Sequence, residues 1–340
     1  MKSVTKIYKT YNLLIRLVII LATYGYIYQQ IFYKRKLEDV LLSFTDYFHD
    51  TYFQLCLLSI ILLMVLNWGV ESFKWKLLIG KVEKVSFLKS IKAVMAGVSV
   101  SMFTPNRTGD YLGRVFILEK ANRLEGVLIT IIGSISQVVI TLVVGAFAFL
   151  AVFYNYGQHK SVITEYLNVT LILLVPIVVF CVLVFYYNVS VLTPFLKKYL
   201  KKKWAKYEAH VNVFSRYSSR ELSWILFLSL IRYFIFSFQF YLLLNMFSVR
   251  LPYLEGILLI AVIYLAMAVI PTIALADLGI RGSVSIYFIG LYFARHGLST
   301  ETLNQGIFAA SSLVWLINLV IPAVLGTFFV YNLKFFRSSR

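Results

Sequence analysis

Six apolar segments of the chain are each long enough to cross a lipid bilayer as one helix, which needs about 20 residues. They cover residues 11–32, 51–73, 126–152, 162–187, 222–247 and 306–331. Hydrophobic residues make up 60% of the 340-residue chain, and the mean hydropathy is +0.80. Soluble globular domains are less apolar. The sequence therefore predicts an all-α polytopic integral membrane protein. It forms one transmembrane domain over residues 1–340, with halves at 11–187 and 222–333 joined by a basic loop at 188–221.

Two further apolar regions are each interrupted by a short polar stretch. The first interruption runs from Met102 to Arg114 and the second from Pro271 to Gly282. Proline lacks an N–H and glycine adopts positive φ, so a continuous helix is not expected at either point. A chain that breaks at membrane depth must bury its open backbone groups in protein or line a wet cavity. We expect two broken, re-entrant helical hairpins at about 91–120 and 253–295, with short full spans or external polar loops as alternatives.

Charged residues gather at these breaks and in the span that starts at Leu222. Arg232 lies ten residues into that span, about 15 Å deep, where a charge is usually functional or paired inside the bundle. Arginine suits phosphate binding because its guanidinium offers paired N–H donors. The acids could orient the arginines, bind an amine or carry a proton. The candidate cavity residues are Arg107, Asp110, Arg114, Arg232, Asp277 and Arg281, with Gln137 and Asn318 as supporting polar residues.

A structural role is an open alternative for several of these residues. Asp110 and Arg114 are four residues apart, as are Asp277 and Arg281, which is the spacing of an ordinary ion pair on one helix face. Arg232 could likewise be a snorkelling or structurally paired residue. Glu71 and Lys74, three residues apart at the end of the second span, can pair on one helix face, and we expect a surface ion pair in preference to a functional role.

Charge distribution predicts the orientation of the chain. The 33 Lys and Arg residues outnumber 15 Asp and Glu residues and concentrate at 74–92, 188–221 and in the tail. Cytoplasmic loops carry such an excess, so these regions and both termini are predicted to lie on the cytoplasmic side of the plasma membrane. Within the basic loop, apolar residues at 196–207 recur at helical spacing. This predicts either an amphipathic helix on the anionic leaflet or a plain basic loop.

The same orientation gives the two halves opposite topology. One unit contains the 51–73 span, the first broken segment and the 126–152 span; the other contains the 222–247 span, the second broken segment and the last span. Interrupted hydrophobic segments at matching positions of two halves point to a transport-type binding site. We therefore predict an inverted repeat in which Gln137 and Asn318 lie at comparable depths.

Motifs of several enzyme classes are missing from the sequence. It contains no G-x-x-x-x-G-K-[ST], G-x-S-x-G or H-E-x-x-H. The four histidines are scattered in loops, and both cysteines lie in apolar stretches. We therefore predict no catalytic residues, metal or cofactor. No soluble segment is large enough to bind nucleic acid, so membrane lipids with anionic headgroups are the expected partners, and the oligomeric state stays open.

Three stretches resemble one membrane-protein family. Pro105 to Arg114 resembles the P-x-R-x-G-E/D signature, with its later Arg, of the lysylphosphatidylglycerol synthetase transmembrane (flippase-like) family. Pro271 to Gly282 is similar to the family's P-G-G-x-G-x-R-E signature, and Asn67 to Lys76 to its early segment. The resemblance covers about 13–331 and implies that Arg107, Asp110, Arg114 and Arg281 are cavity residues. The chain departs from the family at 274–277, which is glycine-rich in the family, at Gly282 in place of an acid, and at Asp110 in place of the commoner Glu.

The resemblance also implies a function. In bifunctional members this domain translocates an aminoacylated phospholipid that a separate soluble domain makes, and no soluble stretch here is longer than the 188–221 loop. We therefore expect a stand-alone lipid translocator that holds an anionic phospholipid or lipid-linked headgroup between the broken segments, and no synthetase. One alternative is a membrane accessory protein that docks an envelope-biosynthesis enzyme on its basic loop. The other is an enzyme that transfers a lipid headgroup.

Overall fold

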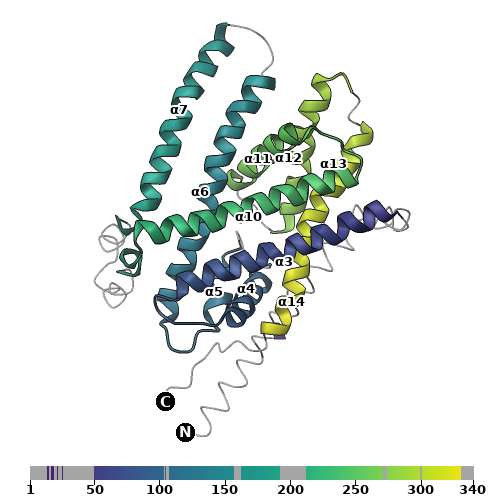
Figure 1. Ribbon diagram of the computed structural model, residues 1–340. Coiled ribbons are helices and arrows are strands. Elements are labelled where there is room, and N and C mark those ends of the chain that lie inside the picture. Colours follow the sequence, from purple (N-terminus) through teal and green to yellow (C-terminus); the bar gives the residue numbers. More distant parts are fainter. Residues whose placement is uncertain are drawn as a thin grey trace, which may run out of the picture.

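The computed structural model describes residues 50–102, 104, 107–156, 162–191, 212–270, 274–298 and 301–330, with single positions between 14 and 25. These residues form helices and short connections, without a strand among them (Figure 1). Five helices are long and apolar enough to cross a membrane: Thr51–Ile79, Arg123–Asn155, Tyr166–Tyr187, Ser219–Met246 and Leu303–Val330. They match five of the six predicted spans, which confirms an all-helical polytopic membrane protein. Apart from those single positions, the first predicted span lies outside the described ranges, as does the 196–207 helix.

Local sequence sets where several helices begin. Helix α3 (Thr51–Ile79) starts at Asp50, whose carboxylate accepts the Tyr52 N–H at 3.0 Å. Helix α4 (Phe87–Ser101) starts at Ser86, whose hydroxyl accepts the Lys89 N–H at 3.2 Å. Each cap satisfies a backbone donor that has no partner inside the helix. Helix α10 (Ser219–Met246) begins with a reciprocal capping box between Ser218 and Glu221.

Helices α3 and α10 run side by side through the middle of the bundle (Figure 1). Helix α6 (Arg123–Tyr156) packs against both of them, and α7 (Val162–Tyr187) packs against α6. At its end α7 also reaches α10, where the Tyr186 hydroxyl donates to the Leu222 carbonyl at 3.1 Å. The final span consists of α13 (Glu301–Trp315), a π-helical turn at Leu316–Val320 and α14 (Ile321–Val330). A π-helical turn inside a helix is rare and is often found at a functional site.

The two broken segments are pairs of helices. The first consists of α4 and the short α5 (Gly109–Val115); the second consists of α11 (Tyr253–Val269) and α12 (Ala274–Arg295). Both breaks fall within the predicted interruptions but are shorter, because the structure is helical again from Gly109 and from Ala274. Residues 103, 105–106 and 271–273 lie outside the described ranges. The limbs of the second pair, with 17 and 22 residues, are longer than those of the first.

Helix packing connects the two halves. Helix α4 packs against α14 at the end of the chain, and α11 packs against α6 of the first half. Gly326 allows the first of these contacts, because a Cβ there would collide with the backbone carbonyl of Met95. Gly145 allows the second, because its Cβ would lie 2.7 Å from Leu265. The first limb of each broken segment therefore lies against the last helix of the opposite repeat unit, α4 against α14 and α11 against α6.

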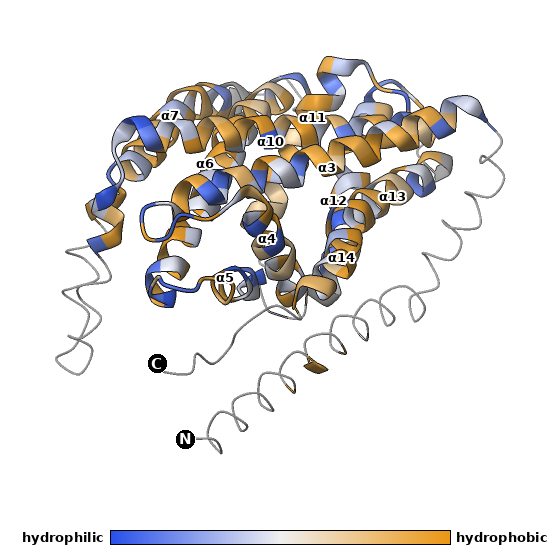
Figure 2. Ribbon diagram, turned by 60° about the horizontal axis from the view of Figure 1, so that its bottom comes forward, coloured by the Kyte–Doolittle hydropathy of each residue, from blue (hydrophilic) through white to orange (hydrophobic). Residues whose placement is uncertain are grey.

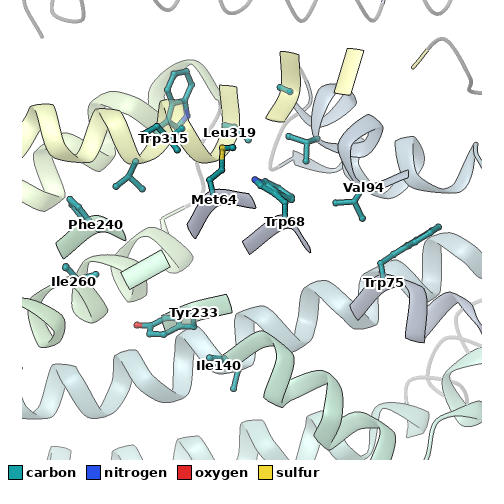
Figure 3. Close-up of a cluster of buried hydrophobic side chains, with 14 of the residues drawn as sticks. Met64, Trp68, Trp75, Val94, Ile140, Tyr233, Phe240, Ile260, Trp315 and Leu319 are labelled. Atoms are coloured by element: carbon teal, nitrogen blue, oxygen red, sulfur yellow. The ribbon is translucent and has the colours of Figure 1, made fainter. Parts of the chain in front are cut away.

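The buried apolar side chains lie between these helices, and the outer surfaces are also hydrophobic (Figure 2). Met64 and Trp68 of α3 lie close to Leu319 of the π-helical turn (Figure 3). Large apolar side chains such as Leu173 and Phe180 of α7 are exposed. An all-round apolar helix of this kind is expected where lipid, and not water, surrounds the protein.

Candidate functional site

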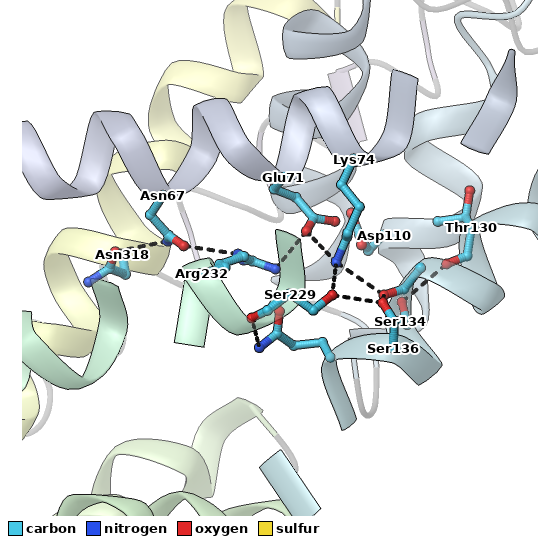
Figure 4. A network of polar contacts seen from close by, with 12 residues as sticks. Asn67, Glu71, Lys74, Asp110, Thr130, Ser134, Ser136, Ser229, Arg232 and Asn318 are labelled. Atoms are coloured by element: carbon cyan, nitrogen blue, oxygen red, sulfur yellow. Dashed lines mark hydrogen bonds and ion pairs between the residues drawn. The ribbon is translucent and has the colours of Figure 1, made fainter. Parts of the chain in front are cut away.

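Glu71 of α3 is the centre of a buried ion network (Figure 4). Its Oε1 accepts from Arg114 Nη1 at 2.7 Å. Its Oε2 accepts from Arg232 Nη1 at 2.8 Å and lies 2.9 Å from Lys74 Nζ. The Glu71 and Lys74 side chains are 5% and 1% exposed. The prediction of a surface ion pair between them is therefore wrong, because α4, α6 and α10 pack around this part of α3.

The Lys74 ammonium joins α3 to two other helices. Lys74 Nζ donates to the Gly133 carbonyl of α6 at 3.1 Å and to the Ser229 hydroxyl of α10 at 3.3 Å. The Ser229 hydroxyl lies 2.8 Å from that of Ser136, and the Gln137 amide donates to the Ser229 carbonyl at 3.4 Å. With Glu71, the ammonium thus has three partners, which matches its number of donors.

Arg232, predicted from its depth in the span, is paired inside the bundle. Its Nε donates to Asn67 Oδ1 at 2.9 Å, and its guanidinium lies 5.1 Å from the centre of the Trp68 ring. The Asn67 amide in turn donates to Asn318 Oδ1 at 3.4 Å. Asn318 belongs to the π-helical turn, so this chain of contacts connects α3, α10 and the last span.

Helix α5 brings a second carboxylate to the network. Asp110 accepts from Arg114 through both oxygens, from Nε at 2.8 Å and from Nη2 at 2.7 Å. Such a bidentate pair fixes the guanidinium plane. Gly97 of α4 makes room for it, since a Cβ at this position would collide with the Asp110 carboxylate. The predicted ion pair between Asp110 and Arg114, four residues apart, therefore exists. Arg114 also connects this pair to Glu71.

A second cluster joins the two broken segments. Arg107 Nη2 donates to Asp277 Oδ2 at 2.7 Å, although the residues are 170 positions apart. Arg281 Nη2 lies 3.6 Å from the other Asp277 oxygen, so this predicted four-residue pair also exists. The Asp277 side chain is 5% exposed and that of Arg107 is 47% exposed. Arg107 has φ +56°, a left-handed conformation that non-glycine residues adopt only a few per cent of the time.

The two clusters together carry a net positive charge. Arg107 is close enough to Arg232 to interact with it electrostatically, which places the clusters near one another. The ion pairs involve five cations and three carboxylates, a net charge of +2. These are Lys74, Arg107, Arg114, Arg232 and Arg281 against Glu71, Asp110 and Asp277. A buried cationic group of this kind can hold an anion such as a phosphate.

The structure brings all six predicted charged residues into these two clusters, and it places Gln137 and Asn318 at the margin of the Glu71 cluster. Sequence reasoning missed Asn67, Glu71 and Lys74 as members. A signal for them exists, because positions four and three residues apart share one face of a helix. Among the described residues, no group of three or more His, Cys, Asp or Glu side chains could hold a metal ion.

These features define a multi-pass, all-helical membrane protein with ion networks buried inside its helical bundle. The family model described as lysylphosphatidylglycerol synthase TM region matches residues 13–326, and the chain belongs to this family. The resemblance seen in the sequence is thereby confirmed. No curated protein and no solved structure matches the chain significantly.

Proposed function

We propose that the protein is a lipid translocator of the plasma membrane that binds an anionic phospholipid or lipid-linked headgroup between its two broken segments. The observation that carries this proposal is the ion pair of Arg107 with Asp277, because it joins the segments through a half-exposed guanidinium. A lipid phosphate offers that guanidinium the same two-oxygen partner as the carboxylate. Membership of the lysylphosphatidylglycerol synthase TM family supports a role in lipid handling.

The cavity residues have distinct roles in this proposal. Arg107 and Arg281 bind the phosphate when Arg107 leaves Asp277. Loss of this ion pair lets the two broken segments separate. Arg232, Arg114 and Asp110 surround the path. The net charge stays positive because Glu71 and Asp110 offset only two of the three cations Lys74, Arg114 and Arg232. The acyl chains stay in the bilayer while the headgroup moves. The protein itself performs no covalent chemistry on the lipid.

We further propose an inverted repeat of six spans and two re-entrant hairpins, with both termini in the cytoplasm. In such a repeat, α3 corresponds to α10, α4 to α11, and α6 to the last span. Under this correspondence, the contact of α4 with α14 is equivalent to the contact of α11 with α6. The same correspondence also maps the central pair of α3 and α10 onto itself. Such a correspondence is what a pseudo-twofold axis in the membrane plane produces.

Leaflet exchange in liposomes tests the proposal. The purified protein is reconstituted with fluorescent lipids of several headgroups, and exchange is followed with and without a proton gradient. We expect exchange of an anionic lipid that is lost in Arg107→Ala and Arg281→Ala, although both variants remain folded. Arg220→Ala is the matched control, because Arg220 is an exposed residue at the start of α10. Normal exchange by both cavity variants contradicts the proposal. Folded wild-type protein that exchanges no lipid favours the accessory or enzyme alternative.

A further inference from the structure

We propose that the site selects lipid headgroups rich in oxygen acceptors and lacking an ammonium group, such as a phosphate diester of a polyol, and disfavours amine-bearing headgroups. This inference rests on the proposed function, because it names the headgroup that the same site takes. It follows from the supply of hydrogen-bond donors and acceptors in the two clusters, and from their net charge.

Every carboxylate oxygen of the site already lies within 3.6 Å of a cation of the protein. Glu71 uses one oxygen for Arg114 and the other for Arg232 and Lys74. Both Asp110 oxygens accept from Arg114. The Asp277 oxygens lie 2.7 Å from Arg107 and 3.6 Å from Arg281. A headgroup amine would therefore have to share any carboxylate oxygen with a cation of the protein, and that cation would repel it.

Several buried N–H donors, in contrast, have no hydrogen-bond partner among the described residues. They include Arg281 Nε, Trp68 Nε1 and Trp315 Nε1. Buried donors are nearly always paired in proteins, so unpaired ones need an explanation. Arg281 belongs to the Asp277 cluster, and the Trp68 ring lies against Arg232 of the Glu71 cluster. Trp68 and Trp315 lie on either side of Met64 (Figure 3). A ligand with several acceptor oxygens would satisfy donors at both clusters.

One amide oxygen in the network also lacks a partner, that of Gln137. It does not provide an amine site, because the Gln137 amide binds Ser229, whose hydroxyl already accepts from the Lys74 ammonium. A second cation beside Lys74 would be repelled. The surplus of two positive charges acts in the same direction, since like charges repel strongly where water is excluded. Selectivity thus comes from attraction of one headgroup class and repulsion of another.

Binding of short-chain lipids to the full-length protein in detergent tests the inference. The probes are phosphatidylglycerol, phosphatidylethanolamine and lysylphosphatidylglycerol with identical acyl chains, and native mass spectrometry measures their affinities. We expect phosphatidylglycerol to bind at least tenfold more tightly than either amine-bearing lipid. Equal or tighter binding of an amine-bearing lipid overturns the inference.

Trp68→Phe sharpens the test, because it removes the N–H and keeps a ring beside Arg232. We expect it to weaken phosphatidylglycerol binding about fivefold and to leave phosphatidylethanolamine binding unchanged. Trp224→Phe is the matched control, since Trp224 is exposed on α10. If Trp68→Phe binds phosphatidylglycerol as the wild type does, the assigned donor is wrong.

Leaflet exchange measured on the same preparation separates this inference from the proposed function. Selective binding of phosphatidylglycerol without exchange supports the headgroup preference and contradicts translocation. Exchange of amine-bearing and polyol lipids at equal rates, with equal affinities, supports translocation and overturns the preference.

Discussion

The two ion clusters of this protein both pair arginines with carboxylates but differ in how completely their members are paired. In the Glu71 cluster, three helices contribute cations to one buried carboxylate, and Asp110 completes the pairing of Arg114. In the Asp277 cluster, two arginines share one carboxylate, one of them is half exposed, and Arg281 Nε has no partner among the described residues.

This difference in pairing suggests a structural role for the Glu71 cluster and a ligand-responsive role for the Asp277 cluster. Loss of one partner from a buried ion network leaves an uncompensated charge, so the Glu71 cluster can hardly change without unfolding. A pair with an exposed member contributes little to stability, so the Asp277 cluster can exchange a carboxylate for a ligand at small cost. We therefore interpret the Glu71 cluster as the fixed wall of the site and the Asp277 cluster as its adaptable part.

The largest effect on the free energy of unfolding is expected for a substitution in the Glu71 cluster. Glu71→Gln removes the charge that Lys74, Arg114 and Arg232 share. We expect the free energy of unfolding to fall by about 3–5 kcal/mol, the usual cost of breaking a buried pair. Thermal unfolding of detergent-solubilised protein, followed by intrinsic fluorescence, measures this change. Glu119→Gln is the control, because its side chain is 58% exposed and 3.5 Å from Lys89. Equal unfolding temperatures for Glu71→Gln and the wild type would contradict the structural role.

A smaller effect is expected where α4 approaches α5. In Gly97→Ala, the new Cβ collides with the Asp110 carboxylate and lies 2.8 Å from Arg114 Cγ, so the two helices must separate. We expect destabilisation of about 1–3 kcal/mol, as for other overpacked interiors, together with slower leaflet exchange. Gly290→Ala on α12 is the control, because its Cβ meets nothing within 4 Å. If both variants unfold at the same temperature, the close approach at Gly97 does not matter for stability.

Glu83, in the connection between α3 and α4, tests whether a buried carboxylate outside the spans behaves in the same way. Burial opposes its ionised form, but N–H groups of Ala121, Lys120 and Glu119 and the Lys89 ammonium outweigh burial and lower the pKa of Glu83 from 4.5 to about 2. Because the folded pKa is depressed, its contribution is present above about pH 4.5 and is lost as the pH falls toward 2.

We therefore expect Glu83→Gln to be less stable than the wild type at pH 7 by about 1–2 kcal/mol, the cost of leaving buried donors poorly paired. This difference should shrink as the pH is lowered from 5 to 3, and unfolding temperatures over this range measure it. A stability difference that is constant between pH 7 and pH 3 would show that the Glu83 charge is not responsible.

Much of the fold follows from sequence, because apolar runs of bilayer length, helix caps and the Pro and Gly residues at the breaks are local signals. The sequence also places Asp110 with Arg114 and Asp277 with Arg281, since four-residue spacing is a property of the helix itself. The contact of Arg107 with Asp277 could not be predicted in this way. It depends on how two segments 170 residues apart pack together.

The sequence did not predict Glu71 as a site residue because of its position in the chain. It lies near the end of an apolar run and close to lysine and tryptophan, a pattern typical of the membrane interface. The helix in fact continues to Ile79, and three other helices cover this part of it. Burial of a helix face is decided by tertiary packing, and one sequence does not report which face of an apolar helix meets protein and which meets lipid.

The smallest effect on stability is expected for Arg107→Gln, and its contrast with the same substitution at Arg114 is the sharpest test of the comparison. Arg107→Gln is expected to lower the free energy of unfolding by about 1 kcal/mol or less, because Arg107 is 47% exposed. Arg114→Gln, in which the replaced side chain is 6% exposed, should lower the free energy of unfolding by about 3–5 kcal/mol.

Anionic lipid should raise the unfolding temperature of the wild type, because a ligand that binds only the folded state stabilises it. Arg107→Gln should lose this lipid-dependent rise while staying folded. Equal destabilisation by the two substitutions would remove the distinction between a fixed and an adaptable cluster, and with it the reason to expect Asp277 to release Arg107 to a lipid phosphate.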